Sequence, residues 1–201
     1  MTDAPQQQEV DAGAVSSPGV TYLLIDGENL DATLGMSVLS RRPSSDERPR
    51  WERVLSFAQR TWGRPVKALF FINASSGHMP MPFVQALMAM GFRPVPLAGP
   101  AGMKVVDVGI QRTLESIGER DGAVLLGSHD GDFLPQVTAL LDAGREVGLL
   151  AFSEFVNSRY AELAGAGLRV FDLEHDVGAF NQPLPRVRII DIDAFDPAAF
   201  L

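Results

Sequence analysis

The residues Val124-Leu125-Leu126-Gly127-Ser128-His129-Asp130-Gly131-Asp132-Phe133 decide how this chain folds. The apolar run at 124–126 predicts a short buried strand that ends at the following glycine. The polar residues beyond it favour neither a strand nor a helix, so a turn must begin there, and a helix is predicted from Phe133. The strand therefore delivers Asp130 and Asp132 into a turn, where their charge needs a partner such as a helix N-terminus or a metal ion.

The rest of the chain alternates strands with helices in the same way. Apolar runs predict further strands at 20–25, 66–72, 92–97, 146–152 and 168–173, and helical patterns lie at 51–62, 82–90, 105–120 and 157–164. Two prolines in the run at 92–97 indicate an edge strand. The strands are continuous apolar runs rather than alternating ones, which indicates burial on both faces. We therefore predict a three-layer α/β/α sandwich around a mostly parallel sheet.

The two ends of the chain differ from this core. Residues 1–19 are polar and contain a glutamine run, which predicts a disordered N-terminal tail, and residues 20–173 form the predicted domain. Residues 174–201 begin with a proline-containing linker and end in a short β-like run with flanking charge. The part at 186–201 has two alternative interpretations: it lies across its own domain as a strap, or it docks on a protein partner. A homodimer is also left open.

Composition restricts the chemistry that the chain can perform. It has no cysteine, which removes disulfides and thiolate nucleophiles, and it has three histidines, of which His129 is expected to face solvent. A metal site would therefore use mainly oxygen ligands, which suits Mg²⁺ or Mn²⁺. No apolar run reaches the ~18 residues of a membrane span, and no secretory signal pattern is present. We expect no membrane contact and a cytoplasmic location.

The charge of the chain is unevenly distributed. The formal net charge of −8 argues against nucleic acid as a partner, but most of the excess acid lies in the two end segments. Residues 41–67 carry eight basic residues against three acids. Arg41 and Arg42 lie in a polar, basic loop predicted at 36–50. A nearly neutral core with such a segment can bind a polyanion, and these two arginines are candidate phosphate contacts.

Four aspartates meet at one predicted edge of the sheet. Asp26 follows the first strand, Asp130 and Asp132 follow the fourth, and Asp107 lies in the first turn of the helix after the third. Right-handed crossovers place them at the carboxyl ends of the strands, where open α/β sheets bind ligands. Converging carboxylates repel one another without a cation, whereas a hard divalent ion takes oxygen ligands and also binds substrate phosphate.

Neutral side chains accompany the aspartates. Asn29 would orient a carboxylate or a phosphate, and Ser128 could donate its hydroxyl to either. Each aspartate also has a purely structural explanation, as an N-cap, a turn residue or a helix-start residue. Their joint placement at one edge favours a metal site that assists phosphodiester cleavage.

Three segments together carry a resemblance to a known family: YLLIDGENL at 22–30, KVVDV at 104–108 and GSHDGDF at 127–133. They resemble the NYN domain of the PIN-like nuclease superfamily, over about residues 20–173. The resemblance implies a sheet in the order 3-2-1-4-5 and a ribonuclease-like site that depends on Mg²⁺ or Mn²⁺, with RNA as the partner. It implies that the catalytic metal ligands are Asp26, Asp107, Asp130 and Asp132, and the candidate substrate-binding residues beside them are Asn29, Ser128, Arg41, Arg42 and Lys104.

Our first hypothesis is therefore a metal-dependent endoribonuclease that hydrolyses RNA. Related sequences often have an aspartate six residues after the one that matches Asp107, where this chain has Thr113. That departure and the acidic end segment motivate the alternative, a weakly active or inactive NYN module that binds RNA or protein as a regulatory domain. A magnesium-dependent phosphatase ranks last, because 26–28 reads Asp-Gly-Glu rather than Asp-x-Asp.

Overall fold

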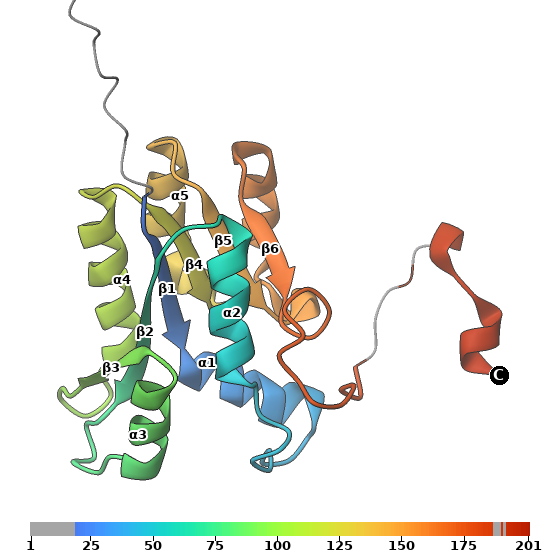
Figure 1. The fold of residues 1–201 in the computed structure, drawn as a ribbon, viewed down its shortest axis with the longest axis horizontal. Coiled ribbons are helices and arrows are strands. Elements are labelled where there is room, and N and C mark those ends of the chain that lie inside the picture. Colours follow the sequence, from blue (N-terminus) through green and yellow to red (C-terminus); the bar gives the residue numbers. More distant parts are fainter. Residues whose placement is uncertain (1–18, 187–189, 191) are drawn as a thin grey trace, which may run out of the picture.

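A six-stranded parallel sheet forms the centre of the computed structural model, which describes residues 19–186, 190 and 192–201 (Figure 1). The strands are β1 (Thr21–Asp26), β2 (Val66–Asn73), β3 (Phe92–Leu97), β4 (Ala123–Gly127), β5 (Val147–Ala151) and β6 (Arg169–Asp172). They lie in the order β3-β2-β1-β4-β5-β6, with every neighbouring pair parallel. The predicted sandwich and the order 3-2-1-4-5 are confirmed. β3, with its two prolines, lies at one edge as predicted, and β6 adds a strand at the other.

The helices connect these strands and cover both faces of the sheet. They are α1 (Gly27–Ala32), α2 (Trp51–Thr61), α3 (Met81–Ala89), α4 (Val105–Gly118) and α5 (Leu134–Asp142), with a π-helix η1 (Thr33–Val38) and the 3₁₀ helices η2 (Gly131–Phe133), η3 (Ser153–Phe155), η4 (Ser158–Ala166), η5 (Ile192–Ala194) and η6 (Pro197–Phe200). The predicted helix at 157–164 is thus a 3₁₀ helix. No helix in the described part of the chain is long and apolar enough to cross a membrane.

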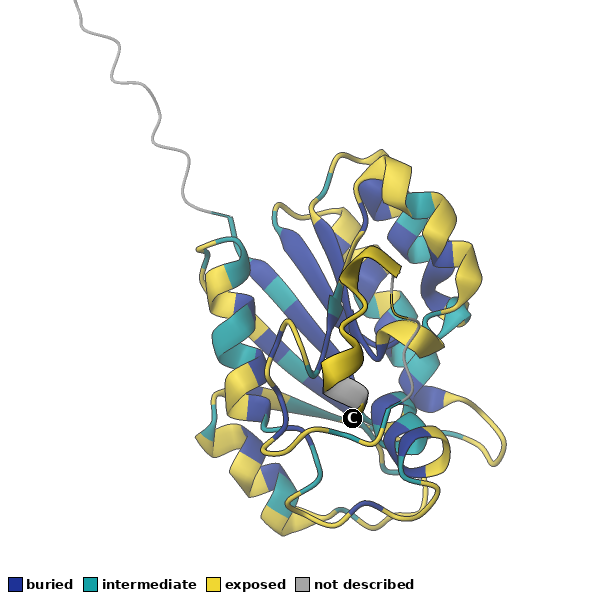
Figure 2. Ribbon diagram, turned by 90° about the vertical axis from the view of Figure 1, so that its right-hand side faces the viewer, coloured by how far each residue is buried: buried dark blue, intermediate teal, exposed yellow. Residues whose placement is uncertain are grey.

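Successive residues of β1 face opposite layers of the sandwich. Leu23 and Ile25 pack in the cluster that includes α1, α2 and α3, whereas Leu24 packs in the cluster that includes α4 and α5. Figure 2 shows the result: the central strands β1, β4 and β5 are almost entirely buried, and the exposed residues lie mainly on the helices and loops. Burial on both faces explains why the strand sequences are continuous apolar runs.

The chain after β6 packs against the same core as α2. Leu173, Val177, Ala179 and Phe180 are all buried in the cluster that also holds residues of α1 and α2. Leu173 ends the predicted domain, and the other three residues belong to the segment at 174–201 predicted as a linker and strap. The predicted tail residues 1–18, and residues 187–189 and 191 of the predicted docking segment, lie outside the described residues.

Arg186 anchors this segment to the domain. Its side chain is 2% exposed and forms ion pairs with Glu154, with Asp172 (2.6 Å from Nη2 to Oδ2) and with Glu174 (2.9 Å from Nη1 to Oε2). Burial by itself raises the pKa of Asp172, but hydrogen bonds from Arg186 and Ser153 outweigh it and hold that pKa well below its ordinary range. Removing the guanidinium would take away the positive charge that compensates these carboxylates.

We expect Arg186→Ala to lower the free energy of unfolding by about 3–5 kcal/mol, because breaking one side of a buried ion pair leaves the other uncompensated. Urea unfolding at pH 7 measures this change. Arg159→Ala, on an exposed part of η4, is the matched control and should change stability by less than about 0.5 kcal/mol. Equal unfolding midpoints for Arg186→Ala and the unchanged chain would contradict the anchoring role.

Candidate active site

The carboxyl ends of β1 and β4 lie side by side at the centre of the sheet. The register pairs Ile25 with Gly127, the last residue of β4. Beyond this pair the two strands separate, because α1 begins at Gly27 with Asp26 as its N-cap and residues 128–130 turn toward η2. β1 has β2 on one side and β4 on the other, so this point is where the direction of the strand order reverses. Open α/β sheets bind ligands at such a point.

Three of the four predicted aspartates form a compact group at this edge. Asp107, Asp130 and Asp132 each offer a carboxylate oxygen, and these oxygens all lie within 4.8 Å of one another. Asp107 lies in the first turn of α4, and Asp130 caps η2 by accepting a hydrogen bond from the Asp132 backbone N–H at 3.0 Å. The N-cap of this short helix is therefore Asp130 and not Asp132.

The fourth aspartate, Asp26, lies beside this group and is 2% exposed. Its Oδ1 accepts from the Asn29 backbone N–H at 3.1 Å, and its Oδ2 accepts from the Ser128 hydroxyl at 3.2 Å. Burial raises the pKa of Asp26 to about 6, and the negative charge of Asp107 adds to this effect while the two hydrogen bonds oppose it. Asp26 is therefore coupled electrostatically to the compact group.

Lys104 places a positive charge among these carboxylates. Its ammonium nitrogen lies 2.7 Å from Asp132 Oδ2 and 3.2 Å from Asp107 Oδ2. These hydrogen bonds, first that to Asp132 and then that to Asp107, raise the pKa of Lys104. The predicted substrate contact is thus bonded to two of the predicted ligands. An all-oxygen donor set that attracts a cation in this way fits a hard divalent ion such as Mg²⁺ or Mn²⁺.

His129 lies inside the site and does not face solvent, so the expectation for this residue is wrong. It is 7% exposed, and its ring hydrogen-bonds through Nε2 with Thr33 Oγ1 at 2.7 Å. Its backbone N–H donates to Asn29 Oδ1 at 3.2 Å. The ring is covered by Phe152 and Phe155, which belong to the segment that follows β5. The sequence of the loop around His129 does not reveal these contacts, because they come from a distant part of the chain.

Three residues that the sequence did not single out contribute to the site. Gln111 donates through Nε2 to the Asp132 carbonyl at 3.0 Å, and Tyr160 donates its hydroxyl to the Asp130 carbonyl at 2.7 Å. Glu28 lies in the first turn of α1, and burial together with Asp107 raises its pKa. Gln111 could have been found, because it lies one turn after Asp107 on the same helix, whereas no sequence pattern points to Tyr160.

Thr113 lies away from the acidic group. Six residues of helix separate it from Asp107, which corresponds to about 9 Å along the axis. Its hydroxyl donates to the Gly109 carbonyl at 2.7 Å within α4. Thr113 thus takes part in the local bonding of its own helix.

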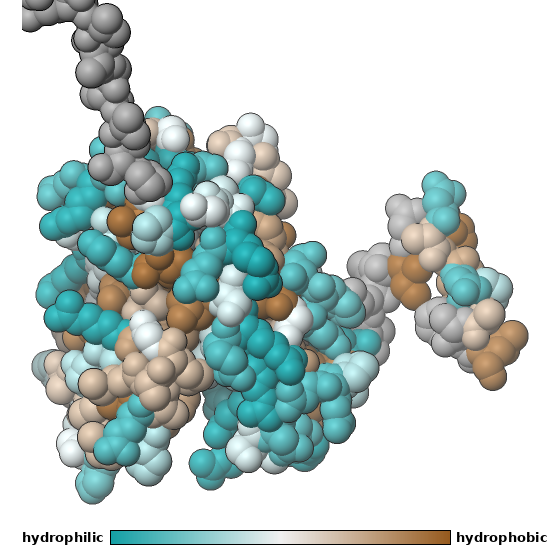
Figure 3. Space-filling view, viewed as in Figure 1, coloured by the Kyte–Doolittle hydropathy of each residue, from teal (hydrophilic) through white to brown (hydrophobic). Residues whose placement is uncertain are grey.

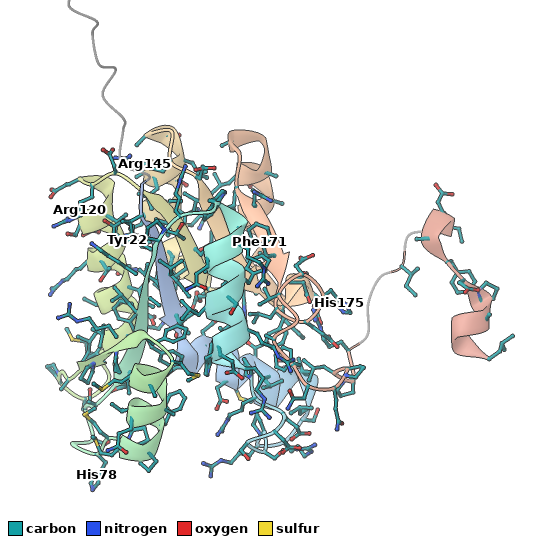
Figure 4. The ribbon with its side chains drawn as sticks, in the orientation of Figure 1. Tyr22, His78, Arg120, Arg145, Phe171 and His175 are labelled. Atoms are coloured by element: carbon teal, nitrogen blue, oxygen red, sulfur yellow. The ribbon has the colours of Figure 1, made fainter. Side chains whose placement is uncertain are left out.

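The two candidate phosphate-binding arginines belong to the loop before α2. Arg41 pairs with Glu47, with 2.5 Å between Nη2 and Oε1, and Arg42 is exposed. In the part of the chain that the structure describes, no hydrogen bond joins either arginine to the acidic group. Arg120 and Arg145 lie at the opposite, amino-terminal end of the sheet (Figure 4).

A second cluster of candidate ligands lies after β6. Asp172, Glu174 and His175 also bring ligand atoms within 4.8 Å of one another. The Arg186 guanidinium is bonded to both of these carboxylates, at 2.6 Å and 2.9 Å. That cluster is therefore already paired with a buried, fixed cation, whereas the acidic group at β1 and β4 is paired with the exposed Lys104.

A parallel three-layer sandwich with an acidic group at its switch point defines the class of the protein as a PIN-like nuclease fold. The family model of the NYN domain matches residues 20–166, and the chain belongs to the NYN domain family. No curated protein matches the chain.

We expect Asp26→Asn to stabilise the metal-free protein by up to about 3 kcal/mol at pH 7.5, since one pKa unit is worth about 1.4 kcal/mol. The pKa of Asp26 rises on folding from 3.8 to about 6, so its stabilising contribution is complete below pH 3.8 and is lost as the pH rises through about 6. Urea unfolding in a chelator at pH 5 and 7.5 measures the difference. Asp142→Asn, an exposed control on α5, should keep the pH dependence of the unchanged chain. An Asp26→Asn protein with that same pH dependence would contradict this assignment.

Proposed function

We propose that the chain is a metal-dependent endoribonuclease that hydrolyses phosphodiester bonds of RNA. The observation that carries the proposal is the convergence of Asp107, Asp130 and Asp132 within 4.8 Å at the switch point of the sheet. Membership of a PIN-like nuclease family supports it. The four predicted catalytic aspartates differ in environment: one is buried, and three form a group that is open to solvent on one side.

Asp107, Asp130 and Asp132 would hold the divalent cation, with Asp26 as the additional ligand. When bound, Mg²⁺ or Mn²⁺ would supply Lewis-acid stabilisation of the charge that develops on the phosphate. A cation nearby also favours the ionised form of Asp26, whose pKa is otherwise raised to about 6 by burial. Ser128 and Asn29 keep both oxygens of that carboxylate in position.

Lys104 would serve the substrate once a divalent ion neutralises the carboxylates. The side chain is 67% exposed and contacts Asp107 and Asp132 through its terminal ammonium group, so it can swing toward a phosphate. Arg41 and Arg42 would hold the RNA strand further from the centre. We also propose a cytoplasmic location, because a reducing compartment suits a chain without cysteine.

The same lysine also favours the second candidate function, a regulatory module with little or no activity. An ammonium group that bridges two carboxylates lowers their repulsion without a metal. Such a chain would bind RNA or a protein and cleave nothing. Manganese-stimulated cleavage that depends on the aspartates separates the two functions.

We expect Asp130→Asn to reduce RNA cleavage by about 10²–10³-fold, because one charged ligand of the metal that would stabilise the transition state is lost. The assay follows defined single- and double-stranded RNA and DNA with Mn²⁺ or Mg²⁺. Asp142→Asn is the matched control, since it removes the same charge from an exposed part of α5. Cleavage at equal rates by Asp130→Asn and Asp142→Asn would exclude the proposed site and identify the activity as a contaminant.

We expect Lys104→Met to bind Mn²⁺ up to about 5-fold more tightly, because an exposed ion pair that competes with the metal is worth up to about 1 kcal/mol. The same change should weaken RNA binding, because one contact to phosphate is lost. Calorimetric titration with Mn²⁺ measures the first effect, and RNA binding to an Asp130→Asn background measures the second. Tighter metal binding without weaker RNA binding would show that Lys104 does not contact the substrate.

A further inference from the structure

We propose that a groove beside the acidic group binds one unpaired nucleobase of the RNA and favours bases that carry an exocyclic amino group. This inference rests on the proposed function and names the part of the substrate that the site recognises. The groove has a volume of about 550 Å³ and lies between α1, the end of β2 and the start of α3. Small-molecule sites commonly occupy about 300–1,000 Å³. Figure 3 shows a hollow between the apolar surface of α3 and the hydrophilic surface beside it.

Aromatic side chains form much of the apolar lining of the groove. Phe70 packs edge-to-face against Trp51, with ring centroids 4.9 Å apart, and against Phe83, at 5.3 Å. All three line the groove. Phe70 and Trp51 are 3% and 9% exposed and hold the half-buried Phe83 in place, so Phe83 is the ring best placed to stack on an unpaired base.

Gly27 lets this aromatic lining reach the first turn of α1. A Cβ atom at this position would lie 2.5 Å from Cε1 of Phe70, so any other residue would displace the ring. The next residue, Glu28, lines the groove and also feels the charge of Asp107. The groove therefore begins where the acidic group ends, and a base bound in it would lie next to a phosphate held at the carboxylates.

The rim of the groove determines what can enter. Asp31 pairs with Arg48, at 2.9 Å between Oδ1 and Nε, and Glu28 and Asn73 also line the groove. Arg48 also lines the groove and balances the charge of Asp31, so Glu28 supplies the net negative charge, which disfavours phosphate, and the groove suits the neutral part of a nucleotide. Carboxylates accept hydrogen bonds from the amino groups of bases, such as N4 of cytosine. Adenine, cytosine and guanine carry such a group and uracil does not, which sets the expected order of affinity.

Trp51 provides a direct test, because it lines the groove and the chain has only one other tryptophan, Trp62, at the far end of α2. In a Trp62→Phe, Asp130→Asn protein, tryptophan fluorescence is titrated with tetranucleotides of adenosine, cytidine and uridine and with an abasic oligomer of equal length. We expect quenching by the adenosine and cytidine oligomers, weaker binding of the uridine oligomer, and no quenching by the abasic one.

Phe83→Ala and Met88→Ala form a matched pair on α3. Phe83 is half-buried in the groove lining, whereas Met88 is 61% exposed and outside it. Loss of one stacking surface should weaken binding of the adenosine oligomer by about 5–100-fold in Phe83→Ala. Met88→Ala should bind as tightly as the parent protein. If Phe83→Ala does not fold, competition by free adenosine against free uridine on the parent protein gives the same answer.

Equal quenching by the abasic oligomer, or equal affinity of the two α3 variants, would overturn the proposal. So would a change in Trp51 fluorescence on removal of residues 190–201 without RNA, since the chain's own end would then occupy the groove. If the groove does not bind a base but the chain is a nuclease, RNA cleavage will depend on Asp130 and will not depend on the identity of the base. If the groove binds a base but the chain is not a nuclease, the Trp51 fluorescence will be quenched in a base-dependent way and no RNA will be cleaved.

Discussion

The buried carboxylate of Asp26 is the constraint on which the site depends. A charge that is 2% exposed at the end of the central strand must be satisfied, and the surrounding chain is arranged to do so. One oxygen caps α1 through the Asn29 backbone, and the other receives the Ser128 hydroxyl. The Asn29 side chain then accepts from the His129 backbone, so the β1 and β4 ends are joined by a continuous set of hydrogen bonds. These bonds offset only part of the desolvation, and the pKa of Asp26 remains raised to about 6.

The Arg186 anchor reaches the same site through packing. Its guanidinium pairs with Glu154 of η3 and lies over the Phe152 ring, 5.3 Å from the centroid. Phe152 and its neighbour Phe155 cover the His129 ring. The segment after β6 therefore holds the layer of side chains that closes one side of the β4 turn. A change at Arg186 should consequently loosen the turn that carries Asp130, although none of the four predicted metal ligands lies in the C-terminal segment.

The sequence was sufficient to predict the strands, because burial on both faces requires continuous apolar runs such as 124–126. It also placed the aspartates at one edge, since parallel strands with right-handed crossovers allow little else. α1 and η1 were missed, because Gly27 and Asn29 are weak helix formers and the helix depends on its cap at Asp26. The burial of His129 and the partners of Arg186 come from contacts between residues far apart in the sequence, which local patterns do not encode.

The carboxylate repulsion that favours a cation at the acidic group also destabilises the folded chain. Asp107, Asp130 and Asp132 lie within 4.8 Å of one another, and their repulsion raises the free energy of the folded chain when no cation is near. Lys104 relieves part of this repulsion, but an exposed ion pair is worth at most about 1 kcal/mol, so a divalent ion can displace it. A fixed arginine plays the corresponding part at Asp172 and Glu174, where the side chain of Arg186 is 2% exposed. The difference between an exposed lysine and a buried arginine is why we propose that the first cluster takes up a metal, whereas the second is a permanent part of the fold.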